Sequence, residues 1–347
     1  MKTTILLIVF YLTAISLIAQ NKPQPYTAFN LKDKNSTIEF LVYETDLTHK
    51  KPVLLFLQGS LPIPLINLDD EGNYHYSILE NFDVEKITKH FHLVAISSPF
   101  TPLVAKYDQI TEQGFYVPDT SKPREFDVNY LKNDKMEVYT ERIDKVIQFL
   151  EKQSWVNKDE IHVFGHSQGS RVAVVAAANN KKIKSVGLFG YNPFGRLEQY
   201  IRQARKDATS GKITWEQADS IINDNIDFMK ILQIEDSINV KPHYTSWKSF
   251  SNSTINQLLS LKQPVYIANG TEDIVGDQCD MLPLLFIEHG KSNYIVKRYG
   301  RLEHNFFPKD ETGTIDYKNG KWKLVIGEYL DWVVPFEKLR MTTSSRK

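Results

Sequence analysis

The sequence contains a single cysteine, Cys279, which excludes an intramolecular disulfide. It also lacks an excess of charge, because 42 lysines and arginines balance 42 aspartates and glutamates. Such a chain has no overall field that would attract nucleic acid or an anionic membrane, and we expect neither as a partner. Hydrophobic residues make up 41% of the chain, which is enough for a large core. Stability must therefore come from packing.

The N-terminal segment, residues 1–20, is predicted to be a signal peptide. A lysine at position 2 precedes a nearly uninterrupted apolar run over 5–19, which is shorter than a membrane-spanning helix requires. The mature protein is then secreted or periplasmic, with no stable membrane partner. Leu17 and Ala19 do not form a standard cleavage motif, so an uncleaved N-terminal membrane anchor is the alternative. Residues 21–347 are expected to form one domain.

Strand-like and helix-like segments alternate along the chain. Apolar β-type runs occupy 52–57, 93–97 and 185–189, and a strand over 36–44 is expected to be antiparallel at an edge. Helices are predicted at 82–90, at 135–153 and at 322–334, where Pro335 should end the last helix. This alternation predicts an α/β fold with a mostly parallel sheet flanked by helices.

The most specific pattern is Gly165-His166-Ser167-Gln168-Gly169. It follows a strand-like run over 160–164 and precedes an alanine-rich helical run over 171–178. A strand, G-x-S-x-G and a helix are the context of a nucleophile elbow. Gly165 and Gly169 leave room for a turn too tight for side chains, and the turn presents the hydroxyl of Ser167. Ser167 is the predicted nucleophile, whereas His166 is expected to be structural.

A nucleophilic serine needs a base, and the base needs a carboxylate that orients it. A strand-like run over 264–268 leads to a turn that starts with Asn269-Gly270 and ends with Glu272-Asp273, and a second run over 293–298 leads to Gly300 and then His304. With these turns in this order after the elbow, the sequence resembles the α/β-hydrolase superfamily of serine esterases, lipases and peptidases. The resemblance implies that His304 is the base and Asp273 the orienting acid, with Glu272 as the competing carboxylate.

The resemblance also implies an oxyanion hole. The run over 52–57 ends in Gln58-Gly59-Ser60, where family members often carry His-Gly-x. The backbone amides of Ser60 and Gln168 are the predicted donors, because a developing oxyanion needs fixed dipoles. Gln58 departs from the family's histidine, and an ordinary turn after the strand is the alternative interpretation.

Residues 193–262 are predicted to be a helical cap or lid inserted before the strand that carries the acid. Thr214 and Gln217 have the spacing of a capping box. Apolar residues then recur with a helical period, and their face is expected to shape the substrate pocket. These residues are Trp215, Ala218, Ile222, Ile226 and Met229. An amphipathic helix packed on the sheet is the alternative.

We expect an exported serine hydrolase that cleaves a carboxylic ester, or an amide, through an acyl-enzyme. Its partner is a small-molecule ester or peptide substrate. No cofactor is expected, and His90 and His92 lack the further ligands that a metal site needs. An acyltransferase, a serine peptidase and an inactive binding protein on the same scaffold are the alternatives. The sequence assigns no oligomeric state.

Overall fold

The computed structural model describes residues 24–32, 36–77, 79–234 and 241–344, so the predicted signal peptide lies outside the described residues. An eight-stranded sheet forms the centre of the molecule in the order β1-β2-β6-β3-β8-β9-β10-β11. The six strands from β6 to β11 are parallel, and β1 and β2 are antiparallel to their neighbours. The strands are β1 (Thr27–Lys32), β2 (Thr37–Val42), β6 (His92–Ile96), β3 (Lys51–Leu57), β8 (Val156–His166), β9 (Ile183–Phe189), β10 (Val265–Gly270) and β11 (Tyr294–Tyr299).

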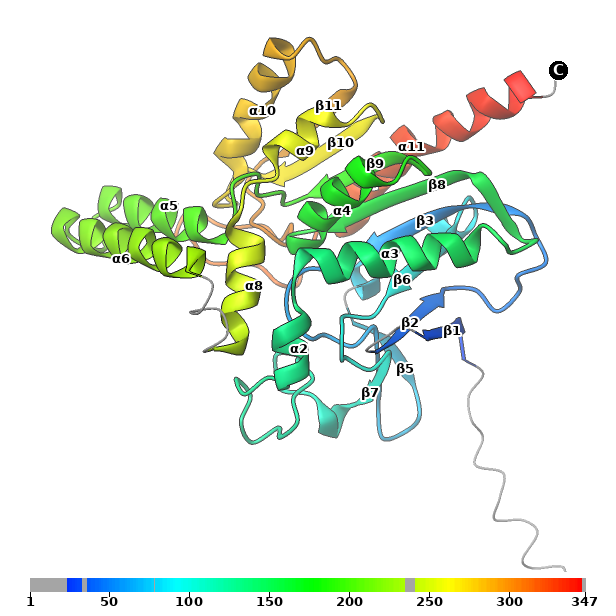
Figure 1. Cartoon of the computed structure of the whole chain (residues 1–347), viewed down its shortest axis with the longest axis horizontal. Coiled ribbons are helices and arrows are strands. Elements are labelled where there is room, and N and C mark those ends of the chain that lie inside the picture. The colour runs from blue at the N-terminus through cyan, green and yellow to red at the C-terminus, as the bar shows by residue number, and fades with distance from the viewer. Residues whose placement is uncertain (1–23, 33–35, 78, 235–240, 345–347) are drawn as a thin grey trace, which may run out of the picture.

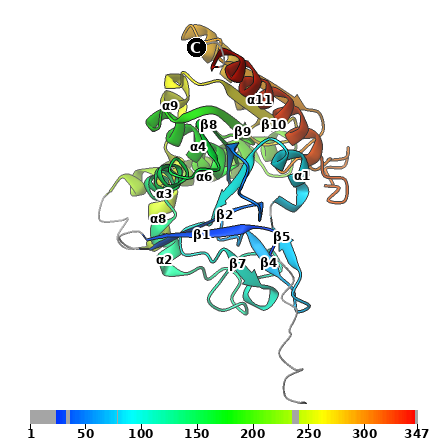
Figure 2. The same ribbon diagram turned by 90° about the vertical axis from the view of Figure 1, so that its right-hand side faces the viewer.

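Helices cover both faces of this sheet (Figures 1 and 2). One face packs against α3 (Met136–Leu150), α4 (Gln168–Asn179), α9 (Ile255–Ser260) and α10 (Gly276–Glu288). The other face packs against α1 (Val84–Thr88) and α11 (Trp322–Ser344). Because both faces are buried, the inner strands are continuous apolar runs. The predicted α/β class with a mostly parallel sheet is confirmed.

Two local predictions are wrong. The antiparallel strand is β2, as expected, but β1 pairs outside it and forms the edge. The last helix does not end near Pro335, because α11 continues to Ser344. A proline removes one backbone hydrogen bond while the turns on either side keep theirs. Pro283 lies inside α10 in the same way.

A smaller sheet with the order β5-β4-β7 and several short helices complete the body. These strands and helices are too short to show a clear hydrophobic periodicity, and they were not predicted from the sequence. They are β4 (Ile66–Leu68), β5 (Tyr74–Tyr76), β7 (Val104–Lys106), the 3₁₀ helices η1 (Leu79–Asn81) and η2 (Tyr107–Gln109), and α2 (Val128–Asn133).

Three helices project from the body, at the left of Figure 1: α5 (Arg196–Thr209), α6 (Trp215–Gln233) and α8 (Pro242–Ser251). We call these three helices the cap. Its two ends lie side by side, because the Thr254 amide donates to the Pro193 carbonyl over 3.0 Å. The next helix, α9, returns to the body and packs beside α4.

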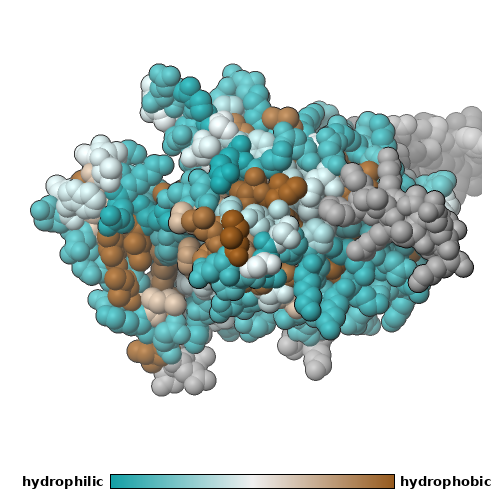
Figure 3. Space-filling model, turned by 90° about the horizontal axis from the view of Figure 1, so that it is seen from above, coloured by the Kyte–Doolittle hydropathy of each residue, from teal (hydrophilic) through white to brown (hydrophobic). Residues whose placement is uncertain are grey.

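The predicted capping box is present at the start of α6, where Thr214 and Gln217 exchange hydrogen bonds. The pair α5–α6 packs through Ala204, Ala208 and Ala218. Several apolar side chains of α6, including Trp215 and Ile226, are exposed, and Figure 3 shows hydrophobic atoms at the surface of this pair, at the left. Within the described residues, no helix is both long and apolar enough to cross a membrane.

Candidate active site

Ser167 lies in the turn between β8 and α4, in a conformation that few residues adopt. Its φ is 55° and its ψ is −121°, a strained region for a residue with a side chain. The two flanking glycines make this turn possible. A Cβ on Gly165 would overlap the Gly169 carbonyl, and a Cβ on Gly169 would overlap the Leu57 carbonyl. The turn therefore packs directly against the end of β3.

The turns after β10 and β11 bring Asp273 and His304 together. Asp273 Oδ2 lies 2.8 Å from His304 Nδ1, and its carboxylate is fully buried. The glycine three residues before the acid allows this approach, since a Cβ on Gly270 would overlap the Leu302 carbonyl. Of the two candidate carboxylates, the structure places Asp273 against His304; Glu272 instead donates its backbone amide to Leu302.

The two partners change each other's pKa. Burial alone would raise the pKa of Asp273, but the charge and hydrogen bond of His304 lower it below its usual value. Burial alone would lower the pKa of His304, but the charge and hydrogen bond of Asp273 raise it above 6.5. With Nδ1 donating to the carboxylate, Nε2 of neutral His304 is free to accept a proton.

His166 supports the loop that carries His304. Its Nε2 lies 2.9 Å from the His304 carbonyl oxygen, and because a carbonyl only accepts, Nε2 carries the hydrogen. The ring packs edge-on against Trp322 at 5.0 Å. Burial, followed by the charge of His304, lowers the pKa of His166 to about 3. His166 is therefore neutral, as suits a structural residue.

The loop after β3 passes beside Ser167. A Cβ built on Gly59 would lie 3.5 Å from the Ser167 Cβ, so the backbone of this loop is close to the serine. Gln58 donates from Nε2 to Ser98 Oγ over 2.6 Å and to the Ile63 carbonyl over 3.1 Å. These bonds fix the loop that carries Ser60.

Gln168 contributes a second backbone amide beside the serine. As the first residue of α4, it lies where helical N–H groups have no partner within the helix. The helix dipole also favours negative charge at this end. Ser60 and Gln168 both line the cavity that contains Ser167 and His304.

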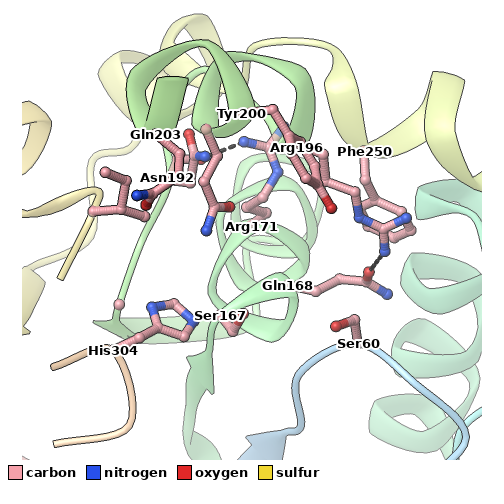
Figure 4. A pocket seen from close by; sticks show the side chains of 13 residues that line it. Ser60, Ser167, Gln168, Arg171, Asn192, Arg196, Tyr200, Gln203, Phe250 and His304 are labelled. Atoms are coloured by element: carbon pink, nitrogen blue, oxygen red, sulfur yellow. Dashed lines mark hydrogen bonds between the residues drawn. The ribbon is translucent and has the colours of Figure 1, made fainter. Parts of the chain in front are cut away.

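This cavity has a volume of about 400 Å³. Figure 4 shows Ser167 and His304 on its floor, and Arg196, Tyr200 and Gln203 extending from α5 above them. The apolar face of α6 does not line the cavity, contrary to the prediction: α6 packs against α5 through Ala218, and only α5 and α8 of the cap contribute lining residues. The cap residues at the site therefore come from α5 and, through Phe250, from α8.

Several residues that line the cavity were not predicted from the sequence: Arg171, Asn192, Arg196, Gln199, Tyr200, Gln203, Phe250 and Ile274. Arg171 had a usable signal, since it follows Ser167 by four positions at the start of a predicted helix, and residues so spaced share a face. For the others, only the packing of the cap reveals their position.

Comparisons with known proteins agree with this architecture. No protein-family model matches the sequence, and no curated protein is similar to it. Among solved structures, the alpha/beta hydrolase GrgF from Penicillium sp. sh18 matches with 16% identity and a TM-score of 0.50. That match covers 89% of this chain and 98% of the other. The chain has the α/β-hydrolase fold.

A second structure similar to this chain is a putative dipeptidyl aminopeptidase IV from Bacteroides ovatus, with 11% identity and a TM-score of 0.50. The match covers 89% of this chain and 35% of that peptidase. The acylaminoacyl peptidase of Pyrococcus horikoshii has a TM-score of 0.48 and 14% identity, with 80% of this chain and 37% of that chain covered. This chain thus spans about a third of the length of these two peptidases. At such identities the likeness concerns the fold alone.

Proposed function

We propose that this α/β-hydrolase is an exported serine hydrolase that cleaves a carboxylic ester. Ser167 is the nucleophile, His304 the general base and Asp273 the residue that orients it. The observation that carries the proposal is the 2.8 Å contact between Asp273 and His304, where His304 lines the same cavity as the strained Ser167. A hydroxyl, an imidazole and a buried carboxylate in this arrangement suit acyl transfer.

The reaction proceeds in two halves. Ser167 Oγ attacks the ester carbonyl carbon while its proton passes to His304 Nε2, and the carbonyl oxygen becomes an oxyanion. Collapse of this intermediate breaks the bond to the leaving alcohol, which takes the proton back from His304. Water then attacks the acyl-enzyme with His304 again as base, and the acid is released with regeneration of Ser167. None of these steps requires a cofactor.

The oxyanion is stabilised by the backbone amides of Ser60 and Gln168 in this proposal. The support is their common cavity with Ser167, the Gln58 bonds that fix the first loop, and the helix N-terminus that carries the second amide. One such donor contributes about 3–4 kcal/mol to lowering the barrier.

Labelling of the purified protein with a fluorophosphonate probe tests the proposal. We expect stoichiometric labelling of the wild type, and loss of labelling in both Ser167→Ala and His304→Ala. Equal labelling of all three proteins would show that the reactive group is elsewhere. No labelling of a folded wild type would support the inactive binding protein instead.

Ester and peptide panels then define the bond that is cleaved. We expect aryl and alkyl esters to be hydrolysed faster than amides or peptides of the same acyl group. Faster turnover on addition of an alcohol acceptor would favour an acyltransferase, and preference for peptides would favour a serine peptidase.

A further inference from the structure

Two arginines from different elements line the same cavity as Ser167 and His304. Arg171 belongs to α4 and is only 3% exposed. Arg196 belongs to α5 of the cap, and its side chain is 23% exposed. Figure 4 shows Arg171 between Ser167 and the side chains that extend from α5, with Arg196 beside Gln168. Two positive charges therefore lie close to the reacting serine.

Arg171 has no carboxylate partner among the residues that the structure describes. Its Nη1 and Nη2 donate to the backbone carbonyls of Asn192 and Asn252, and its Nε has no hydrogen-bond partner. Burial lowers the pKa of Arg171 to about 10, and Arg196 contributes in the same direction. The guanidinium is still protonated at neutral pH, so a buried charge faces the cavity without a counter-ion, which is unfavourable.

Among the described residues, the one carboxylate paired with Arg196 is already engaged by other groups. Asp134 Oδ2 lies 3.7 Å from Arg196 Nη2. The same carboxylate accepts from Gln168 Nε2 over 2.9 Å and from the Tyr139 hydroxyl over 3.0 Å. Arg196 also donates to Gln168 Oε1 and to Ser246 Oγ. Among the described residues, Asp134 therefore pairs with Arg196 alone and leaves the charge of Arg171 unbalanced.

Donor groups are left over for a ligand. A guanidinium carries five N–H donors, and the bonds described above use two on Arg171 and two on Arg196. Arg196 also lines an adjoining cavity of about 420 Å³ beside Phe126 and Trp247. Its guanidinium therefore lies where an extended substrate would pass from one cavity to the other.

We propose that this cavity selects esters that carry a free carboxylate, with Arg196 binding the carboxylate in the positive field of Arg171. The planar fork of arginine matches a carboxylate, and such charge-assisted bonds are strong in a partly buried site. The inference rests on the proposed hydrolase function, and names its substrate class. Asn192 and Gln203 line the same cavity and supply further polar contacts.

Two matched substrate pairs test this inference. The 4-nitrophenyl monoester of adipic acid differs from 4-nitrophenyl hexanoate only in a terminal carboxylate on the acyl group. The pair 4-acetoxybenzoate and 4-methylphenyl acetate places the carboxylate on the leaving group. Because the two phenols differ as leaving groups, each enzymatic rate is divided by the rate at which hydroxide hydrolyses the same ester. In at least one pair we expect kcat/KM of the wild type to favour the anionic ester by about 10-fold to 100-fold.

Arg196→Gln should bring this ratio towards one, chiefly through KM of the anionic ester. Arg205→Gln is the matched control, because Arg205 lies on the same helix but its guanidinium stacks over Trp215, outside the cavity. That control should keep the ratio. Arg171→Gln should also lower the ratio, and Arg171→Lys, which keeps the charge, should restore part of it.

A ratio of one or less for both pairs in the wild type would overturn the inference. An unchanged ratio in Arg196→Gln would also overturn the inference. The two arginines would then serve only to hold the cap in place. If Arg171→Gln does not fold, the Arg196 variant decides the question. Failure to hydrolyse any ester, together with failure to react with the fluorophosphonate, would contradict the proposed function itself.

Discussion

Asp273 and His304 act as a pair, because each holds the other in the charge state that the proposed reaction needs. Only neutral His304 can accept the proton of Ser167, and Asp273 raises the pKa of this histidine above 6.5. Activity should therefore rise with pH through a pKa above 6.5. A profile of kcat/KM between pH 5 and pH 9 measures this limb.

Asp273→Asn should lower kcat by about 10⁴-fold, because the imidazole loses the partner that fixes its tautomer. Loss of the negative charge should also move the acid limb of the profile to lower pH. Glu272→Gln is the control, and we expect its activity to stay within about twofold of the wild type, as for most surface changes. The opposite pattern would make Glu272 the orienting acid.

His166 should make the protein sensitive to acid. Its pKa is about 3 in the folded protein, below the value of about 6.5 for an unfolded chain. The unfolded state therefore binds a proton first as the pH falls, and stability present above pH 6.5 is lost towards pH 3. The loss at pH 5 is about 2 kcal/mol. Chemical denaturation of the wild type and of His166→Gln at pH 7 and pH 5 measures this loss in the free energy of unfolding. His289→Gln is the control, because His289 is exposed.

At the scale of elements, the site depends on turns that pack backbone against backbone. Gly169→Ala places a methyl group against the Leu57 carbonyl at the end of β3. We expect it to lower the free energy of unfolding by about 2–4 kcal/mol and to abolish fluorophosphonate labelling. Gly300→Ala is the control, because a Cβ there meets no atom within 4 Å. Equal stability of the two variants would contradict this account of the elbow.

Some elements could be predicted from the sequence because local patterns specify them, and others could not. The elbow and the turns after β10 and β11 were predictable because short-range sequence patterns specify them: glycines at fixed offsets, and strands rich in β-branched and aromatic residues. Three other features were not predictable from the sequence: the path of α11 through Pro335, the short strand β4, and the placement of α5 instead of α6 over the site. Each depends on contacts between segments distant in the sequence, which local patterns do not encode.

At the scale of the whole molecule, we expect the chain to be exported and trimmed. Expression in a bacterium with the N-terminal segment intact should give a protein outside the cytoplasm whose first residue is Gln20 or Asn21, as measured by intact mass. Removal of residues 1–20 should leave the protein in the cytoplasm. A membrane-bound protein of full mass would support the uncleaved anchor.

Arg171 binds the carbonyls of Asn192 and Asn252, one on each side of the cap. The chain thus leaves the body and returns to it at two adjacent backbone segments, which one side chain from α4 holds together. Exchange of these three helices for another insertion would change the roof of the cavity, provided that the new helices supply partners for Gln168, Asp134 and Asp277 of the body. In evolution and in engineering alike, recombination at these two points would alter the residues above Ser167 and His304 without changing the elements that carry these two residues.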